Sequence, residues 1–201
     1  MPAATLPAPT TNDALPRKQF TRAEVERMMD LGLFAGQRCE LIDGDLIDKM
    51  GQKPPHSTGI QKIANLLAAV FGIHRLRIQL PIEASTADRE RSMPEPDLAV
   101  LKAASVDYEQ RHPNGDELLL VVEVSDTTAQ YDSTTKRDLY ARAGVPEYWV
   151  LDVRRRVLRI HRRLSNGQYK EIAEIAETEI ARTESLPEVE IQVADLLPKK
   201  R

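Results

Sequence analysis

The sequence has little of what marks a secreted or membrane protein. Its single cysteine, Cys39, cannot form an internal disulfide, and no Cys/His cluster has the spacing of a zinc site. No stretch approaches the roughly 18 consecutive apolar residues that a membrane helix needs. The N-terminus also lacks the charged-then-apolar layout of a signal peptide. We therefore expect a cytoplasmic protein with no membrane partner.

The sequence also lacks an excess of positive charge. Lys and Arg together number 28 against 31 for Asp and Glu, which gives a net charge of -3. This balance argues against a protein that coats nucleic acid through bulk charge. It leaves room for a local basic patch beside an acidic metal site.

The length and composition predict a single folded domain. With 201 residues, 41% of them hydrophobic, the chain can bury a core without disulfides or a structural metal. Residues 1–18 carry repeated Pro, Ala and Thr without an apolar period, and we expect them to form a disordered tail. Residues 19–198 contain no internal repeat and no second boundary, so we expect a single domain there.

Hydrophobic periodicity predicts a chain in which helices and strands follow one another. Thr21 followed by Glu24 is a capping box, and Asp43-Gly44 between apolar pairs is a strong hairpin signal. The almost continuously apolar run 117–124 is typical of a central strand covered on both faces. This pattern indicates an α/β or α+β domain with a mixed sheet. The predicted elements are, in order, a helix closed by Gly32 or Gly36, a hairpin over 40–48, a helix after Pro54-Pro55 that reaches Phe71, strands over 78–82, 97–101 and 117–124, a helix over 132–143 capped by Gly144, and strands over 147–153 and 157–163.

The candidate chemistry begins with two acids on neighbouring predicted strands. Asp97 lies at the mouth of one buried strand, and Glu123 lies near the end of the next, most apolar one. A buried carboxylate is costly unless a partner or a metal compensates its charge. Two such groups side by side suit Mg²⁺ or Mn²⁺. The structural alternative is that Asp97 caps the turn after Pro96 and Glu123 pairs with an arginine.

Lys136 favours the metal-site hypothesis. It precedes Leu139 and Tyr140 by three and four residues, so it shares their inward face on the predicted helix. An ammonium beside two acids can neutralise a phosphate and can hold or activate an attacking water. The alternative is a lysine that extends past the apolar face into solvent.

Four segments together resemble the Uma2 (DUF820) proteins. The segments are Met93–Asp97, Val121–Ser125, Tyr131–Lys136 and Tyr140–Asp152. The resemblance spans roughly residues 20–197. Its most specific part is the Gly-Val-Pro-Glu-Tyr-Trp run with its upstream lysine, because short PD and E-x-K elements recur by chance.

Uma2 proteins are assigned to the PD-(D/E)XK nuclease superfamily. The resemblance implies a restriction-endonuclease-like core, a mixed sheet flanked by helices, with Asp97 and Glu123 as metal ligands. The lysine usually found two residues after the glutamate is replaced here by Ser125. Lys136 on the next helix takes its part, and Uma2-type sequences look alike in this respect.

Three further residues could join this site. Glu40, which opens the hairpin, matches an acid that nuclease-like folds often place near the metal; a surface charge is the alternative. His56, at the start of the second helix, could meet a phosphate together with the positive end of that helix. A solvated residue at the helix start is the alternative for His56. Asp132 precedes Ser133 and Thr134 as an N-cap would, so we expect it to cap its helix rather than bind metal.

Six arginines crowd into residues 154–163. Strand alternation puts Arg159 and His161 on the face opposite their apolar neighbours, where a basic edge could contact a phosphate backbone. We favour the structural alternative, an outer strand that its charges keep soluble and protect from edge pairing. Tyr148 and Trp149 lie inside an apolar strand, and we expect them in the core.

Two functions of different classes follow from these residues. The first is a Mg²⁺- or Mn²⁺-dependent endonuclease acting on DNA, in which Asp97 and Glu123 hold the metal and Lys136 assists the attacking water. The second is a nuclease-like scaffold that no longer cuts and binds nucleic acid or protein instead. The presence of both acids and the lysine favours the enzyme. A homodimer would suit it, because two-fold related sites can cut both strands of a duplex.

Overall fold

The computed structural model describes residues 17–49, 53–104 and 108–200. The predicted disordered tail over 1–18 lies outside the described residues except for Arg17 and Lys18. No helix in these described ranges is long and apolar enough to cross a membrane.

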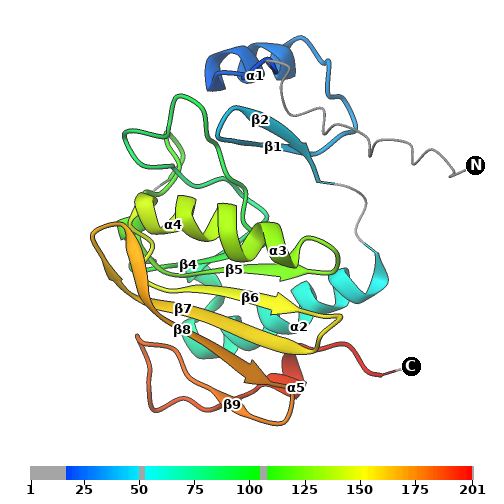
Figure 1. The fold of residues 1–201 in the computed structure, drawn as a ribbon, viewed down its shortest axis with the longest axis vertical. Coiled ribbons are helices and arrows are strands. Elements are labelled where there is room, and N and C mark those ends of the chain that lie inside the picture. Colours follow the sequence, from blue (N-terminus) through cyan, green and yellow to red (C-terminus); the bar gives the residue numbers. More distant parts are fainter. Residues whose placement is uncertain (1–16, 50–52, 105–107, 201) are drawn as a thin grey trace, which may run out of the picture.

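A mixed sheet of six strands forms the middle of the molecule (Figure 1). The strands lie in the order β3-β4-β5-β6-β7-β8; β5 and β6 are parallel, and every other neighbouring pair is antiparallel. All but one residue of β5 is buried, as expected for a central strand. The bounds are β3 (Leu76–Ile78), β4 (Leu98–Leu101), β5 (Leu118–Ser125), β6 (Tyr148–Asp152), β7 (Val157–Ser165) and β8 (Gln168–Ala176).

Helices cover both faces of this sheet. On one face, α2 (Pro54–Phe71) and the short α5 (Val193–Leu196) pack against a core that includes the buried Trp149. On the other face, α4 (Arg137–Ala143) packs its Tyr140 against Tyr148. The result is the expected α/β architecture with a mixed sheet between helices, and Tyr148 and Trp149 are core residues as predicted.

The N-terminal elements form a separate layer at the top of Figure 1. The capping box of Thr21 and Glu24 begins α1 (Arg22–Asp30). A hairpin follows, made of β1 (Cys39–Ile42) and β2 (Asp45–Asp48). Asp43 (φ 50°) and Gly44 (φ 86°) both adopt the left-handed conformation that a two-residue hairpin turn requires. The hairpin is attached to the segment before β4, where the Met93 amide donates to the Leu41 carbonyl.

The connection from β5 to β6 is helical but irregular. It begins with α3 (Ala129–Tyr131), widens into a π-helical turn (Asp132–Lys136) and continues as α4, which ends at Gly144 with a φ of 89°. The helix therefore begins before Asp132, and the predicted N-cap role of that residue is wrong. Asp132 has helical backbone angles, and its carboxylate instead accepts hydrogen bonds from nearby hydroxyl groups.

One predicted strand is misplaced. The strand expected over 78–82 lies earlier, as β3, because Gln79 adopts a left-handed φ of 53° and Pro81 lacks an amide hydrogen. The other predicted elements are present with shifts of a few residues at their ends. Towards the C-terminus, β9 (Ile180–Ala181) pairs with β10 (Ile191–Gln192) just before α5.

Candidate active site

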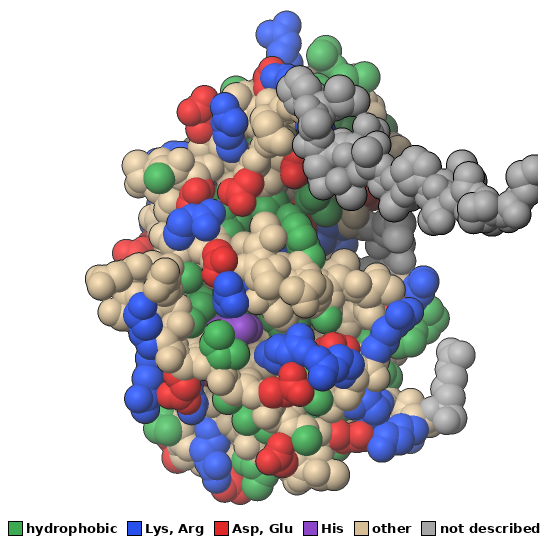
Figure 2. Space-filling view, in the orientation of Figure 1, with side chains coloured by type: hydrophobic (Ala, Val, Ile, Leu, Met, Phe, Trp, Pro, Cys, Tyr) green, Lys and Arg blue, Asp and Glu red, His purple; other side chains and the backbone are tan. Residues whose placement is uncertain are grey.

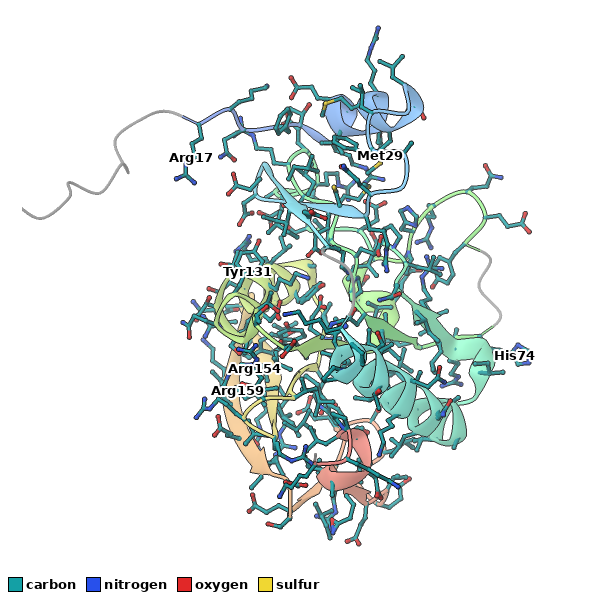
Figure 3. All side chains as sticks on the ribbon, turned by 90° about the vertical axis from the view of Figure 1, so that its right-hand side faces the viewer. Arg17, Met29, His74, Tyr131, Arg154 and Arg159 are labelled. Carbon is teal, nitrogen blue, oxygen red and sulfur yellow. The ribbon has the colours of Figure 1, made fainter. Side chains whose placement is uncertain are left out.

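A pocket of about 260 Å³ lies where β5 ends, beside the start of α2 and the π-helical turn. Figure 3 views this side of the molecule, with Tyr131 and Arg154 to one side of α2 and His74 at the far end of that helix. The structure brings five of the predicted site residues to this pocket, together with Asp132. The six side chains are those of Glu40, His56, Asp97, Glu123, Asp132 and Lys136.

Strand register places the two predicted metal ligands opposite each other. Leu98 of β4 pairs with Val122 of β5, so the next step along each strand brings Asp97 to Glu123. The Val124 amide donates a hydrogen bond of 2.9 Å to Asp97 Oδ2 and fixes that carboxylate at the strand end. Both acids are almost fully buried, with 2% and 3% of their surface exposed.

Lys136 reaches these acids from the following helix. Its Nζ lies 2.9 Å from Glu123 Oε1 and 2.7 Å from Glu40 Oε1, and the residue is 3% exposed. Burial works to lower the pKa of Lys136, but the carboxylates of Glu123 and Glu40 outweigh it and raise this pKa well above its ordinary value. This raised pKa favours the ammonium form of the lysine. Because the side chain is buried against the two carboxylates, the alternative in which it extends into solvent is wrong.

The π-helical turn accounts for this reach. Such turns insert an extra residue into a helix and occur frequently at functional sites. The turn is anchored through Asp132, whose Oδ2 accepts hydrogen bonds of 2.6 Å from both the Ser125 and the Thr128 hydroxyl groups. The Tyr148 hydroxyl donates to the Asp132 carbonyl at 3.0 Å. With its first residue held from three sides, the turn directs Lys136, its last residue, into the pocket.

Glu40 is a buried partner of the lysine. Its second oxygen, Oε2, accepts a hydrogen bond of 3.2 Å from the Glu95 amide, and only 3% of the residue is exposed. The alternative of a surface charge on the hairpin is therefore wrong. Both oxygens of Glu40 therefore have partners, the Lys136 ammonium at Oε1 and the Glu95 amide at Oε2.

His56 contacts Asp97 from the first turn of α2. Its Nε2 lies 3.4 Å from Asp97 Oδ2. Burial works to lower the pKa of His56, yet Asp97 raises it overall. In return, although burial works against ionisation of Asp97, His56 and the charge of Lys49 lower the pKa of Asp97 to about 2. Asp97 is thus a carboxylate, and the histidine is a contributor to the pocket rather than a solvated helix-start residue.

Tyr140 completes the surroundings of Glu123. Its hydroxyl donates a hydrogen bond of 2.7 Å to Glu123 Oε1, the same oxygen that Lys136 contacts. Sequence reasoning placed this tyrosine on the inner face of its helix but gave it no part in the site. Its spacing of four residues from Lys136 was the signal that could have revealed it.

The donor set fits a hard divalent cation. Burial raises the pKa of Glu123, the charge of Lys136 opposes this rise, and the neighbouring Asp97 carboxylate adds to it. Glu123 shares the Lys136 ammonium with Glu40, so this lysine compensates only part of the charge, and a bound cation would supply the rest. Within the described ranges, no group of three or more His, Cys, Asp or Glu side chains is arranged to hold a metal. Mg²⁺ is usually bound through one or two carboxylates, with waters and substrate phosphates as the other ligands, so a pair of acids such as Asp97 and Glu123 is compatible with it.

Arg159 lies outside the pocket. Its Nε donates to Glu174 Oε2 at 2.9 Å, and its Nη1 donates to the Ser133 hydroxyl at 3.1 Å. The other arginines of 154–163 are also paired with acids, most of them on or next to β8. These ion pairs agree with the structural alternative for the basic strand.

Comparison with known proteins places this geometry in a family. The model of the Uma2 family, described as "Putative restriction endonuclease", matches residues 23–194. Among solved structures, the fold is similar to a "putative nuclease belonging to DUF820" from Anabaena variabilis. The TM-score is 0.64 at 15% sequence identity, over 79% of this chain and 88% of that one. Among curated proteins, none matches the sequence.

Proposed function

Since this chain belongs to the Uma2 family, we propose that it is a metal-dependent endonuclease that hydrolyses phosphodiester bonds in DNA. The observation that carries the proposal is the buried cluster in which Lys136 lies 2.9 Å from Glu123, while Asp97 is opposite Glu123 on the next strand. Two carboxylates and an ammonium at one strand end are the groups that metal-assisted phosphate hydrolysis needs.

Asp97 and Glu123 are the proposed ligands of Mg²⁺ or Mn²⁺. When bound, such a cation supplies polarisation of the phosphate and lowers the pKa of a water molecule. Asp97 is suited to this task because it is ionised and held at the strand end by the Val124 amide. Glu123 is held through Oε1 by the Tyr140 hydroxyl.

Lys136 is the proposed group that stabilises negative charge and orients the attacking water. It acts as a hydrogen-bond donor, since its neighbours keep it protonated. Glu40 is the proposed positioning residue for this ammonium, because its contact of 2.7 Å holds Nζ independently of Glu123. Its assignment as a third metal ligand is the competing proposal. His56, beside Asp97, is a proposed donor to a substrate phosphate.

Nicking of supercoiled plasmid DNA by the purified protein tests this function. We expect cleavage in Mg²⁺ or Mn²⁺ that is lost in Asp97→Ala and Glu123→Ala and reduced by about 10² or more in Lys136→Ala. Asp116→Ala, which removes an exposed acid that does not line the pocket, is the matched control and should cut as the wild type does. Melting temperatures show that the variants are folded.

Two results would contradict the proposal. Equal cleavage by the Asp97 and Glu123 variants would mean that another site, or a contaminant, cuts the DNA. Tight DNA binding without product in any divalent metal would favour the non-cutting scaffold. Titration with Mn²⁺ distinguishes the enzyme from a scaffold that has lost its metal site. The enzyme should bind Mn²⁺ and lose that binding in Asp97→Ala, whereas such a scaffold should not bind it at this site. Sedimentation with and without DNA tests whether the active species is a homodimer.

A further inference from the structure

A second hollow lies on the other side of the first turn of α2. It encloses about 710 Å³ and is open to solvent. Its walls come from three parts of the chain: the start of α2, the turn between β6 and β7, and the segment after α5. Its charged lining residues are Lys62, Arg156, Lys199 and Lys200.

The lining of this hollow is basic, although the whole chain is acidic. Four of its nine lining residues are cationic, and none is an acid. Glu177 binds Arg156 through two hydrogen bonds and pairs with Lys200 at 3.0 Å, so one carboxylate compensates part of this charge. Lys62 donates to the backbone carbonyl of Asp195 at 3.2 Å, a contact that leaves its charge uncompensated. Figure 2 shows Lys and Arg side chains gathered beside the C-terminal end of the chain, at the lower right.

The hollow and the candidate active site lie on two sides of the same turn of α2. Lys53 and His56 line the active-site pocket, whereas Pro54, Pro55 and Thr58 of the same turn line the hollow. On the opposite wall, Val153 of the hollow is joined to the end of β5 by the hydrogen bond from its amide to the Ser125 carbonyl, at 3.0 Å. A ligand that extends past this turn of α2 would therefore meet both sites.

We propose that the basic hollow binds the sugar-phosphate backbone of the DNA strand on one side of the phosphate that is cut. This inference rests on the proposed nuclease function. The lysines contact phosphates without reading sequence, and the proline and valine walls face the sugars. A local cluster of positive charge in this hollow is compatible with a net charge of -3, since the protein then contacts DNA at one place and does not coat it.

Salt-dependent DNA binding by the triple variant Lys62→Ala, Lys199→Ala, Lys200→Ala tests the proposal. Binding to a labelled duplex is measured without divalent metal, so that no product forms. We expect at least a tenfold loss of affinity at low salt and a slope of log K against log salt that is smaller by about 2 to 3. In Mg²⁺, we expect a raised KM for cleavage with little change in kcat, because the lysines lie outside the cluster around Glu123.

Two further triple variants are the controls. Arg27→Ala, Lys102→Ala, Lys170→Ala removes the same charge from exposed residues that line neither pocket, and it should leave the slope within about 1 of the wild type. The triple variant with arginine in place of Lys62, Lys199 and Lys200 should restore affinity.

Equal losses in the alanine triple and the charge-matched triple would overturn the proposal, as would an unchanged salt slope in the former. Binding of polyglutamate, a model of an acidic protein, is measured for the same variants. If the alanine triple loses polyglutamate binding but still binds DNA as the wild type does, the hollow binds an acidic protein and the proposal is wrong. A wild-type protein that binds DNA without cutting it contradicts only the nuclease function, and the hollow is then tested by binding alone. If the wild type neither binds nor cuts DNA, both proposals are wrong.

Discussion

Among single residues, the two histidines near the sheet have opposite protonation tendencies. Asp97 raises the pKa of His56. Burial, together with the charges of Arg137 and Arg159, lowers the pKa of His161 to about 4. His161 is 1% exposed, lies 5.5 Å from the Tyr148 ring, and has no hydrogen-bond partner for either nitrogen in the part of the chain that the structure describes. It is therefore a neutral aromatic group within the core.

Replacement of His161 by phenylalanine should flatten the acid side of the stability profile. The pKa of His161 is about 4 in the folded state and 6.5 in the unfolded chain, so the unfolded chain takes up the proton first as the pH falls. Stability is retained above about pH 6.5 and decreases by roughly 2 to 3 kcal/mol towards pH 4. His161→Phe keeps the ring contact but cannot be protonated. Urea unfolding between about pH 7.5 and 5 measures the difference.

The exposed His74 gives the control for this experiment. His74→Gln is the matched variant, because it removes an exposed imidazole outside the core. A pH dependence that is the same in His161→Phe and the wild type would show that protonation of His161 does not contribute.

Some residues of the site can be predicted from the sequence, and others cannot. Asp97, Glu123 and Lys136 were identifiable because a charged group on an apolar face needs a compensating partner. Asp132 was misjudged, since an acid that precedes two hydroxyl residues has the same local pattern whether it caps a helix or is buried within one. The spacing of Tyr140 from Lys136 places both residues on one helix face, but the hydrogen bond from Tyr140 to Glu123 of β5 depends on how α4 packs against the sheet.

Among the elements, α4 is held in place by a close backbone contact at its C-terminal end. Gly115 precedes β5, and a Cβ atom there would collide with the Ala143 carbonyl and come within 3.0 Å of the Val145 amide. Only a residue without a side chain allows this approach. Because α4 carries Tyr140 and follows Lys136 directly, the contact also supports the active-site pocket.

Gly115→Ala should therefore destabilise the fold. We expect a loss of about 1 to 3 kcal/mol, because backbone atoms cannot move aside as a flexible side chain would. Thermal unfolding should show a midpoint lower by roughly 2 to 4 °C for each kcal/mol. Asp116→Ala, at the exposed neighbouring position, is the control and should change the midpoint little. A wild-type midpoint for Gly115→Ala would mean that the two segments can separate without cost.

Elements with strong local signals were the ones that sequence reasoning located correctly. The capping box of α1 and the Asp43-Gly44 turn act within four residues, so the chain encodes them directly. The strand placed over 78–82 failed because the left-handed Gln79 breaks the apolar pattern without a glycine to mark it. The π-helical turn has no local signature, since its first residue, Asp132, is held by contacts with Ser125 and Tyr148.

For the whole molecule, the site is assembled from segments far apart in the sequence. Glu40 comes from the hairpin, His56 from α2, Asp97 from the end of β4, Glu123 from β5 and Lys136 from the π-helical turn. The sequence indicates these groups but does not place Glu40, because the position of the hairpin depends on long-range contacts with the segment before β4. The net charge is likewise an average over an acidic pocket and a basic hollow that are neighbours.

The buried Glu40–Lys136–Glu123 cluster predicts a contrast between a single and a multiple substitution. Lys136→Met alone leaves buried acids without their cation and should cost about 3 to 5 kcal/mol. Replacing the cluster together, by Glu40→Gln, Glu123→Leu, Lys136→Met and Tyr140→Phe, removes the charges and the unpaired hydroxyl. This variant should be as stable as the wild type or more stable, by up to about 4 kcal/mol. Thermal and urea unfolding of both variants measure the sign, and destabilisation of the quadruple variant would contradict the prediction.

That contrast sets a direction for protein engineering. A screen for heat resistance alone would enrich apolar residues at Glu123 and Lys136, because the charges there cost desolvation energy and serve the proposed reaction. Each round of such a screen would then yield a more thermostable protein with less activity. Stabilising substitutions that keep the chemistry belong away from this cluster, and a screen that selects survival and DNA cleavage together would direct them there.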